Sequence, residues 1–448
     1  MLKSAPRVRL GMQKKHFIVL FIVCSIGAYP AFSQKINKNF FHIESHGEVS
    51  WFLDPEGREF FSTGIDVVTP TDRGGTGGPS YSGLRRNGGS IQKWNAETIS
   101  RLKVWNVNTI GAWSTLRGEP YVVEFPLSGK YMDVFDDQFE ASLRMAAQDA
   151  LSRYHFGISF RKLDADPLLI GYFTDNELAW GWGYRWSGKE NEYSLFEYYA
   201  SLTSDKGKTV WVDYLARTYA HDWRRFCQVW NVSVKGRQDL FKITKIAPRG
   251  SAQMGEAQRV ADGFLRMVAE RYFSLTSALM RRYLPHHLNL GPRFAEGVPD
   301  VVTEVAAKYV DVVSLNIYTR NLAHFRNEVE RVWSAGKKPI LITEFSFPAK
   351  VNRSGNLNQG YLHAQVEDQY ERGVYYARCT EMLSKLPFIV GYHWFQYFDE
   401  PTNGRGDGES GNFGFVDLDN RIYEPLAEGA SRANAQAAEW HRSSAAQD

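Results

Sequence analysis

Eight short apolar runs, separated by longer amphipathic stretches, dominate the pattern of hydrophobic and polar positions along this chain. Strands buried on both faces of a parallel sheet have short apolar runs of this kind. Their alternation with helical stretches is typical of βα units. The predicted strands are residues 60–68, 107–113, 121–125, 168–174, 287–290, 311–317, 339–343 and 388–394. Eight such strands predict an α/β fold, the (β/α)8 TIM barrel.

The stretches between these runs have helical patterns. The predicted helices are residues 96–104, 137–154, 258–282, 301–309, 322–335 and 364–385, and a last helix begins near Tyr423. The connection from the fourth strand to the fifth is much longer than the others. We expect an insertion after strand 4, at about residues 180–255, that forms a wall of a cleft where the strands end. A small separate subdomain is the alternative.

The segment before the first strand has the pattern of a hairpin. Pro55 and Gly57 occupy the second and fourth positions of Asp54-Pro55-Glu56-Gly57, as a type I turn prefers. We therefore expect residues 34–61 to form an N-terminal hairpin segment that caps the bottom of the barrel. Residues 62–448 are then expected to form the (β/α)8 domain.

The segment 1–33 has the pattern of a secretory signal peptide. Lys14 and Lys15 precede an apolar core at residues 17–26, and small residues at 31–33 provide a cleavage site near Ser33. The apolar core is about half of the ~20 residues that a membrane-spanning helix needs. We expect a secreted or periplasmic protein. Lipidation at Cys24 is less favoured, because the preceding Val23 is bulky.

The predicted signal peptide accounts for the positive net charge of the whole chain. The whole chain carries a formal charge of +3, but the segment 1–33 contains five lysine and arginine residues and no acid. The remainder therefore carries −2, which removes any indication of a nucleic acid or membrane partner. Cys227 and Cys379 are too few for a disulfide framework or a structural zinc site, and whether they are bridged is left open. No cofactor and no metal site is expected.

Two predicted strands place a glutamate where they leave the sheet. Residues 168–174 lead into Asn176-Glu177, and residues 339–343 are followed directly by Glu344. The carboxyl ends of barrel strands meet on one face, where residues from different strands form one site. Two carboxyl groups across a sugar ring are the groups that glycoside hydrolysis requires. The chain is also 14% aromatic, and flat aromatic surfaces pack against sugar rings.

In a retaining glycosidase one carboxyl group is protonated and assists the leaving oxygen, while the other is ionised and attacks the anomeric carbon. We assign Glu177 as the acid/base and Glu344 as the nucleophile. Asn176 is expected to donate to the sugar 2-hydroxyl. The expected substrate-binding residues are Asn176, Trp113, Trp180, Tyr318, His393, Trp394, Arg293 and Asn316.

Three of these residues have more specific expected roles. Tyr318 is expected to donate to Glu344 and keep it ionised, and Trp394 to form the floor of the innermost sugar subsite. Packing in the core is the alternative for both residues. His393 is expected either to bind substrate or only to pack.

Five segments resemble the TIM-barrel β-agarase family of clan A retaining glycoside hydrolases. They are residues 171–177, 287–294, 314–318, 391–397 and 411–417, within a resemblance that spans about residues 50–440. The resemblance implies retaining cleavage of β-1,4 links between D-galactose and 3,6-anhydro-L-galactose, with Glu177 and Glu344 in the roles above. Such agarases often carry a large N-terminal carbohydrate-binding domain, and we expect only a short hairpin in its place here.

The sequence leaves several alternatives open. The substrate is expected to be a poly- or oligosaccharide, with another β-galactoside or a sulfated algal galactan as alternatives to agarose. A glycan-binding barrel without activity and transglycosylation are the alternatives to hydrolysis. Endo or exo action and the oligomeric state do not follow from the sequence.

Overall fold

The computed structural model describes residues 37–71, 81–128, 133–157, 163–180, 195–203, 205–405 and 408–446. The signal peptide predicted for residues 1–33 lies outside the described residues. The first part of the predicted insertion, residues 181–194, lies outside them as well.

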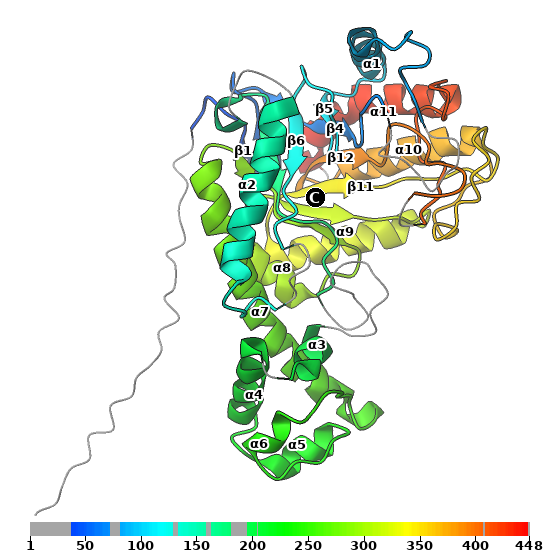
Figure 1. Ribbon diagram of the computed structural model, residues 1–448. Coiled ribbons are helices and arrows are strands. Elements are labelled where there is room, and N and C mark those ends of the chain that lie inside the picture. The colour runs from blue at the N-terminus through cyan, green and yellow to red at the C-terminus, as the bar shows by residue number, and fades with distance from the viewer. Residues whose placement is uncertain are drawn as a thin grey trace, which may run out of the picture. The chain divides into compact units, whose positions relative to one another are not determined.

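The centre of the fold is a parallel barrel (Figure 1). Within the described residues, its sheet has the strand order β8-β7-β6-β5-β4-β12-β11-β10-β9, with every neighbouring pair parallel. The strands are β4 (Ser62–Ile65), β5 (Thr109–Ile110), β6 (Tyr121–Glu124), β7 (Leu169–Phe173), β8 (Leu288–Asn289), β9 (Arg293–Ala295), β10 (Val313–Asn316), β11 (Ile340–Glu344) and β12 (Ile389–Trp394). Each of the eight predicted ranges contains a strand of this sheet: β8 lies in the fifth range, and β9 follows it as a ninth strand outside the predicted ranges.

β8 and β9 together close the ring. β8 pairs with β7, whereas β9 pairs with β10 on the other side. The chain beyond β7 also pairs with β9, since the backbone N–H of Glu177 donates to the carbonyl of Arg293 at 2.9 Å. The predicted (β/α)8 barrel with an insertion after strand 4 is therefore confirmed.

Alternation along each strand separates two cores. Leu341 and Val390 point into the barrel, while their neighbours Ile340, Ile342 and Ile389 pack among the surrounding helices. Successive side chains of a strand point to opposite faces. Strands that are apolar on both faces are therefore required here, as their sequences indicate.

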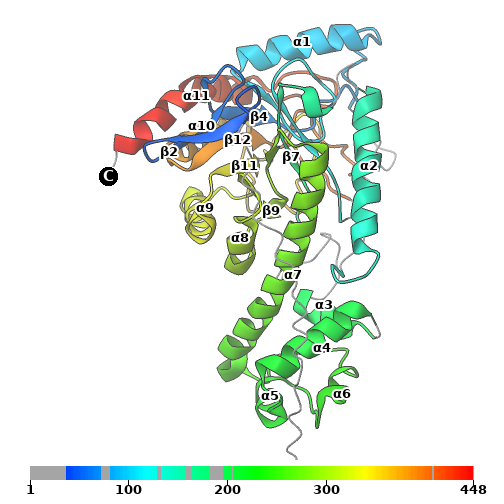
Figure 2. The ribbon, with the colours of Figure 1, turned by 90° about the vertical axis from the view of Figure 1, so that its left-hand side faces the viewer.

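Helices cover the outside of the barrel (Figures 1 and 2). They are α1 (Ile91–Val104), α2 (Phe139–Gly157), α8 (Asp300–Ala306), α9 (Leu322–Gly336), α10 (Gln369–Ser384) and α11 (Glu424–Arg442). Short 3-10 turns occupy Leu163–Ala165, Ser251–Gln253 and Ser443–Ala446. Residues 111–120, between β5 and β6, contain no helix.

Side-chain caps set two helix starts that the predicted ranges missed. Ser90 accepts a hydrogen bond from the backbone N–H of Lys93, so α1 begins before the predicted residue 96. Asp368 accepts from two backbone N–H groups, so α10 begins after the predicted residue 364. A capping oxygen satisfies N–H groups that have no partner within the helix.

A small antiparallel sheet covers the amino ends of the barrel strands. It contains β1 (His42–His46), β2 (Val49–Leu53) and β3 (Glu59–Phe60). The turn at residues 54–57 is closed by a hydrogen bond from the N–H of Gly57 to the carbonyl of Asp54 at 2.8 Å. Phe41 and Phe52 are buried and pack with the barrel interior.

The chain between β7 and β8 forms a group of helices outside the barrel. They are α3 (Leu195–Ser201), α4 (Lys206–Thr218), α5 (Trp223–Val229), α6 (Arg237–Leu240) and the long α7 (Met254–Tyr283). In Figure 2, α7 runs along the barrel and continues beyond it to α3–α6. The hydroxyl of Tyr272 lies 2.9 Å from the carbonyl oxygen of Thr174 and 2.7 Å from Oδ2 of Asp175. Tyr272 therefore lies level with the carboxyl end of β7.

We expect Phe52→Ala to lower the free energy of unfolding by about 3–5 kcal/mol, because it leaves a cavity where a buried ring closes the barrel. Urea unfolding measures this change. Tyr370→Ala is the control, because this ring is 72% exposed and its loss should cost less than about 0.5 kcal/mol. Equal, small losses in both variants would show that the N-terminal sheet does not stabilise the barrel.

Candidate active site

The two predicted glutamates meet at the carboxyl ends of the strands. Glu344 is the last residue of β11, and Glu177 follows β7. The amide nitrogen of Asn316, at the end of β10, lies 3.0 Å from Glu177 Oε1 and 2.9 Å from Glu344 Oε1. The two oxygens are therefore no further apart than the sum of these distances. Two carboxyl groups that share one amide donor fit the short separation of retaining glycosidases, about 5–5.5 Å.

Arg293 forms a buried ion pair with Glu344. Its Nη1 lies 2.9 Å from Glu344 Oε1, while its Nη2 lies 2.6 Å from Asp66 Oδ2 and 2.7 Å from the carbonyl oxygen of Thr343. The guanidinium also lies over the ring of Trp113, 4.2 Å from its centroid. Arg293 is completely buried. It therefore positions Glu344, and the expectation that Arg293 itself contacts substrate was wrong.

Asp66 depends on a neighbouring glycine for its place. Its Oδ1 accepts a hydrogen bond from the backbone N–H of Ala112 at 2.8 Å. A Cβ atom at Gly111 would lie 2.0 Å from the same oxygen. Only glycine at position 111 leaves room for this carboxylate beside Arg293.

The environments of the two glutamates differ. Glu344 accepts hydrogen bonds from Asn316 and from the hydroxyl of Tyr318, and it also pairs with Arg293. Glu177 accepts a hydrogen bond from Asn316. A carboxylate is stabilised by donors and by a nearby cation. The environment of Glu344 therefore favours its ionised form more than that of Glu177 does.

Burial and mutual repulsion shift both carboxyl groups. Burial raises the pKa of Glu344, and the negative charge of Glu177 raises it further, while Arg293 and Tyr318 lower it. Burial also raises the pKa of Glu177, against the opposing effects of Asn316 and Arg293. Two close carboxyl groups resist double ionisation. The pair therefore retains a proton more readily than a lone carboxyl group does.

A pocket of about 350 Å³ opens beside the pair. It is lined by Glu177, Ala295, Glu296, Asn316, Tyr318, Gly360, Tyr361 and His363. Gly360, Tyr361 and His363 come from the loop between β11 and α10, residues 345–368. The pocket thus reaches Glu177 and Tyr318, whereas Glu344 is only 5% exposed.

Asparagine side chains brace this loop. Asn352 donates to the carbonyl oxygens of Ala349 and Asn356 at 3.0 and 2.9 Å. Asn358 donates to the same carbonyl of Ala349 at 2.9 Å. Such side-chain bonds give a loop backbone partners that regular structure would otherwise provide. The loop thereby presents Tyr361 to the pocket in a defined position.

Several functional candidates were missed from the sequence. The hydroxyl of Tyr361 hydrogen-bonds Glu409, whose negative charge raises the pKa of Glu177. Glu400 is buried and pairs with Arg405 at 3.0 Å. These residues lie in loops that carry no strand or helix pattern. Their polar, glycine-rich surroundings alone gave no sign that Tyr361 and Glu409 lie near Glu177.

Three backbone positions next to the strand ends have left-handed conformations. Val67, Trp113 and Glu177 have φ values of 57, 56 and 48°, shortly after β4, β5 and β7. Residues other than glycine rarely adopt this backbone conformation, which costs them about 1–3 kcal/mol. Surrounding contacts must hold these turns in place.

Two expected substrate-binding residues point away from the site. Trp394 is fully buried, donates its indole N–H to the carbonyl of Phe413 at 2.7 Å, and packs against Phe345 and Tyr376. It faces the helices, because its neighbour His393 occupies the inward position of β12. The expectation that Trp394 forms a subsite floor was wrong. Trp180 is also buried and stacks on Phe273, so its expected contact with substrate was wrong too.

His393 points inward but packs. Its Nε2 lies 2.9 Å from the hydroxyl of Ser62, and its ring lies where a Cβ of residue 64 would be. Burial lowers its pKa to about 3, so the imidazole is neutral. Of the two expected roles for His393, the structure supports packing.

The remaining expected residues gather at the site. Asn176 is half-buried, and its side-chain oxygen accepts from Asn316 at 3.3 Å and from Arg293 at 3.4 Å. These bonds leave its NH2 group as the available donor. Trp113 is partly exposed above Arg293.

Among the described residues, no cluster of three or more His, Cys, Asp or Glu residues has the arrangement of a metal site. In the same part of the chain, no helix combines the length and apolar character needed to cross a membrane. Cys227 and Cys379 are both free thiols.

We expect Arg293→Met to lower the free energy of unfolding by about 3–5 kcal/mol at pH 8, because it leaves two buried carboxylates without their cation. Burial already raises the pKa of Asp66 to about 7, and loss of Arg293 raises it further. A group with a raised folded pKa loses its stabilising effect as the pH rises through that value. The loss should therefore be smaller at pH 5, where both carboxyl groups take up protons.

Urea unfolding at the two pH values measures this difference, with the exposed Arg259→Met as control. An equal loss at pH 5 and pH 8 would contradict the charge pairing.

Comparisons with known proteins give the same picture of the fold. No protein-family model matches the chain. It is 28% identical to β-agarase B of Vibrio sp. (strain JT0107) over 381 residues, which cover 78% of this chain and 37% of that protein. It is 26% identical to β-agarase A of the same strain, covering 86% of this chain and 44% of that protein. The chain thus spans less than half the length of both curated relatives.

Solved structures superpose over most of the chain. An agarase with 25% identity has a TM-score of 0.71, covering 91% of this chain and 66% of that one. An exo-β-agarase with 21% identity has a TM-score of 0.73, covering 92% of this chain and 68% of that one. The chain therefore resembles β-agarases in sequence and solved agarase structures in fold, over most of its own length.

Proposed function

We propose that this chain is a secreted retaining glycoside hydrolase that cleaves a β-linked galactan, with agarose the favoured substrate. The observation that carries the proposal is the single amide of Asn316 that hydrogen-bonds both Glu177 and Glu344. Two carboxyl groups that share one donor fit the about 5–5.5 Å separation of retaining enzymes better than the wider spacing, with room for a water molecule, that inversion requires. The spacing supports a double displacement with a covalent intermediate.

In the first step, Glu344 attacks the anomeric carbon and Glu177 protonates the departing glycosidic oxygen. This bond breakage leaves a glycosyl ester on Glu344. In the second step, Glu177 removes a proton from water, which displaces the ester oxygen and restores both carboxyl groups. The product keeps the configuration of the substrate.

The protonation states that this mechanism needs follow from the surroundings of each group. Arg293, Tyr318 and Asn316 stabilise the ionised Glu344. Burial favours the protonated form of Glu177, and the nearby charge of Glu409 acts in the same direction. When Glu344 becomes an ester, its negative charge disappears. Ionisation of Glu177 then becomes easier, as the second step requires.

Other residues have roles in binding. The free NH2 group of Asn176 is suited to donate to the sugar 2-hydroxyl, a contact that strengthens toward the transition state. Trp113 and Tyr361 present aromatic surface near the two carboxyl groups. Agarose is favoured because the two curated relatives are β-agarases and a solved structure at 25% identity is an agarase.

We expect Glu177→Gln and Glu344→Gln each to lower kcat on agarose by more than about 100-fold, because each removes a group that forms or breaks a bond. Reducing-end release and mass analysis of the products measure the activity, and neoagaro-series oligosaccharides are the expected products. Glu304→Gln is the matched control, since this exposed glutamate pairs with Arg266 away from the site. Thermal unfolding should be nearly unchanged in all three variants.

Azide distinguishes the two roles. On a galactoside with an activated leaving group, azide should restore turnover to Glu177→Ala, because this nucleophile needs no general base. Near-normal agarose hydrolysis by either Gln variant would overturn the assignment. Binding of agarose by the unaltered chain without any hydrolysis would instead indicate a glycan-binding barrel.

A further inference from the structure

The segment that contains α4, α5, α6 and the start of α7 carries a net positive charge, unlike the rest of the chain after residue 33. Residues 205–259, here called the helical lobe, contain eleven lysine and arginine residues against five aspartate and glutamate residues, a formal charge of +6. The whole sequence carries +3 and the segment 1–33 carries +5. The rest of the chain after residue 33 therefore carries −8. Positive charge is thus concentrated in the helical lobe.

Many of these cations are free to meet a ligand. Arg217, Arg224, Lys235, Lys245 and Arg259 are exposed, and none of them forms an ion pair with an acid among the described residues. The remaining lobe cations include one buried residue, Lys208, which donates to two backbone carbonyls. The positive charge of an exposed cation that forms no ion pair is available to attract an external anion.

The acids of the lobe neutralise other cations. Glu256 pairs with Arg225, Asp213 with Arg237, and Asp239 with Lys242. Asp222 caps α5 through the backbone N–H of Arg225 at 3.0 Å. Asp205 lies at the start of α4. The surplus positive charge is therefore not cancelled inside the lobe.

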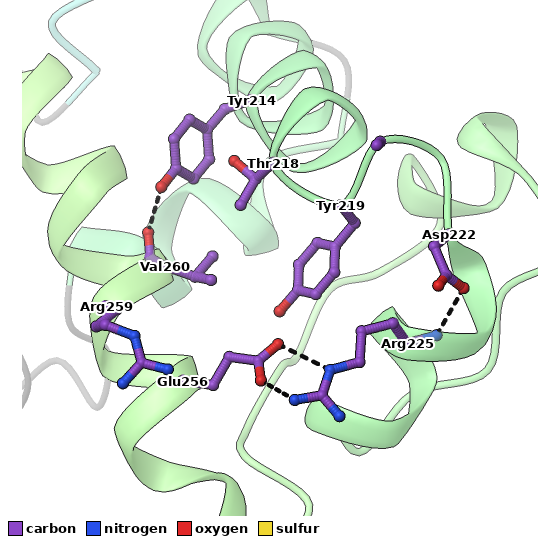
Figure 3. Close-up of a pocket in the computed structure, with 9 residues that line it drawn as sticks. Tyr214, Thr218, Tyr219, Asp222, Arg225, Glu256, Arg259 and Val260 are labelled. Carbon is purple, nitrogen blue, oxygen red and sulfur yellow. Dashed lines mark hydrogen bonds and ion pairs between the residues drawn. The ribbon is translucent and has the colours of Figure 1, made fainter.

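Three of these exposed cations, Arg259, Lys235 and Lys245, line two hollows in the surface. One, of about 420 Å³, lies between α4, α5 and the start of α7, with Thr218, Arg225, Glu256 and Arg259 on its walls. In Figure 3, Glu256 engages Arg225 through two contacts, whereas no contact joins Arg259 to the other residues drawn. The second hollow, of about 590 Å³, has Lys235, Lys242 and Lys245 on its walls.

The first hollow borders the short helix α5, and the second is lined by residues 232–245, which follow this helix in the chain. Arg225 lies in the first half of α5, and beyond the middle of this helix Cys227 accepts a hydrogen bond from Arg249 through its carbonyl at 2.9 Å. The sulfur of Cys227 accepts from the N–H of Val234 at 3.3 Å, next to Lys235. The hydrogen bond between Cys227 and Val234 thus connects α5, which borders the arginine hollow, to the segment that lines the lysine hollow. Cations in two separate hollows suit a chain with repeated negative charges better than one small anion.

The lobe stands on the catalytic side of the barrel. Tyr272 on α7 lies level with the carboxyl end of β7, where it bonds Thr174 and Asp175. The part of α7 that precedes Tyr272 begins at Met254 and extends beyond that level. At a rise of about 1.5 Å per residue, it reaches about 27 Å past Tyr272. A polymer bound at Glu177 can therefore extend toward the lobe.

We infer that the helical lobe binds an anionic galactan, a polysaccharide chain with sulfate ester groups, and holds it beside the catalytic face. The inference rests on the proposed function, since it makes the bound chain part of the same polymeric substrate. Lysine and arginine donate hydrogen bonds to sulfate oxygens, and the sulfate charge persists at every ordinary pH. Among the large apolar side chains that are exposed in the described residues, only Met254 belongs to the lobe. The described lobe thus has no large aromatic side chain in the exposed class for stacking nucleic acid bases, and only Met254 for contact with a membrane.

The test compares binding of the full chain to unmodified agarose and to chemically sulfated agarose by affinity electrophoresis. The lobe variant combines Arg217→Gln, Lys235→Gln and Lys245→Gln. The control variant combines Lys93→Gln, Arg326→Gln and Arg432→Gln, which removes the same charge from exposed sites on the barrel helices. Thermal unfolding of both variants should match the unaltered chain, because exposed substitutions change stability little.

We expect the unaltered chain to bind sulfated agarose more tightly than agarose, and to lose this preference as salt is added. The lobe variant should bind sulfated agarose about tenfold more weakly, as expected for the loss of three exposed charge pairs. The control variant should bind as the unaltered chain does. Hydrolysis of short neutral oligosaccharides should be unchanged in both variants.

Equal binding by the lobe and control variants would overturn the inference, as would equal binding of the two agaroses. Tighter lobe-dependent binding of duplex DNA or of phosphatidylserine vesicles than of sulfated agarose would overturn the choice of partner. Because binding is measured without turnover, a chain that binds sulfated agarose but hydrolyses no galactan would refute the proposed function alone.

Discussion

The buried guanidinium of Arg293 is the constraint on which the centre of the structure depends. A buried cation is stable only when opposite charges and hydrogen-bond acceptors surround it. Asp66, Glu344 and the carbonyl of Thr343 provide them. Arg293 lies on β9, Asp66 directly follows β4, and Thr343 and Glu344 lie on β11, so three strands meet at this cluster. The requirement to satisfy one side chain therefore fixes the position of the carboxylate that we propose as the nucleophile.

The same constraint separates the roles of the two glutamates. Glu344 is fixed by Arg293, Asn316 and Tyr318, and it is almost completely covered. Glu177 stands at the edge of the pocket on a turn with a positive φ. A fixed, ionised group suits attack on carbon, whereas a group that gains and loses a proton suits a position open to water. The chemistry thus follows from the difference in environment between two identical side chains.

Much of the fold was predictable because local patterns determine it. The strands are apolar on both faces, and this pattern marked eight of them. Glu177 and Glu344 could be found because strand ends of a barrel share one face. For Trp394, the sequence pattern did not determine which way the side chain points. His393 and Trp394 are neighbours at the end of one apolar run, and only the orientation of β12 in the barrel decides that the histidine points inward.

Contacts between distant segments could not be predicted. Asp66 lies beside Arg293 because Gly111 leaves space for it, and no single segment contains that information. Tyr361 and Glu409 meet across two irregular loops. The charge of the helical lobe is visible in the sequence, but the net charge of the whole chain conceals it. Its place on the catalytic side follows only from the level of Tyr272 on α7.

Covalent trapping of the nucleophile tests the central claim most directly. A 2-deoxy-2-fluoro-β-galactoside with a good leaving group slows both steps of a double displacement and lets the glycosyl ester accumulate. Digestion and mass analysis of the labelled protein then locate the sugar. The account predicts one sugar per chain, attached to Glu344. Hydrolysis of this substrate without any label, or a label on a different residue, would contradict it.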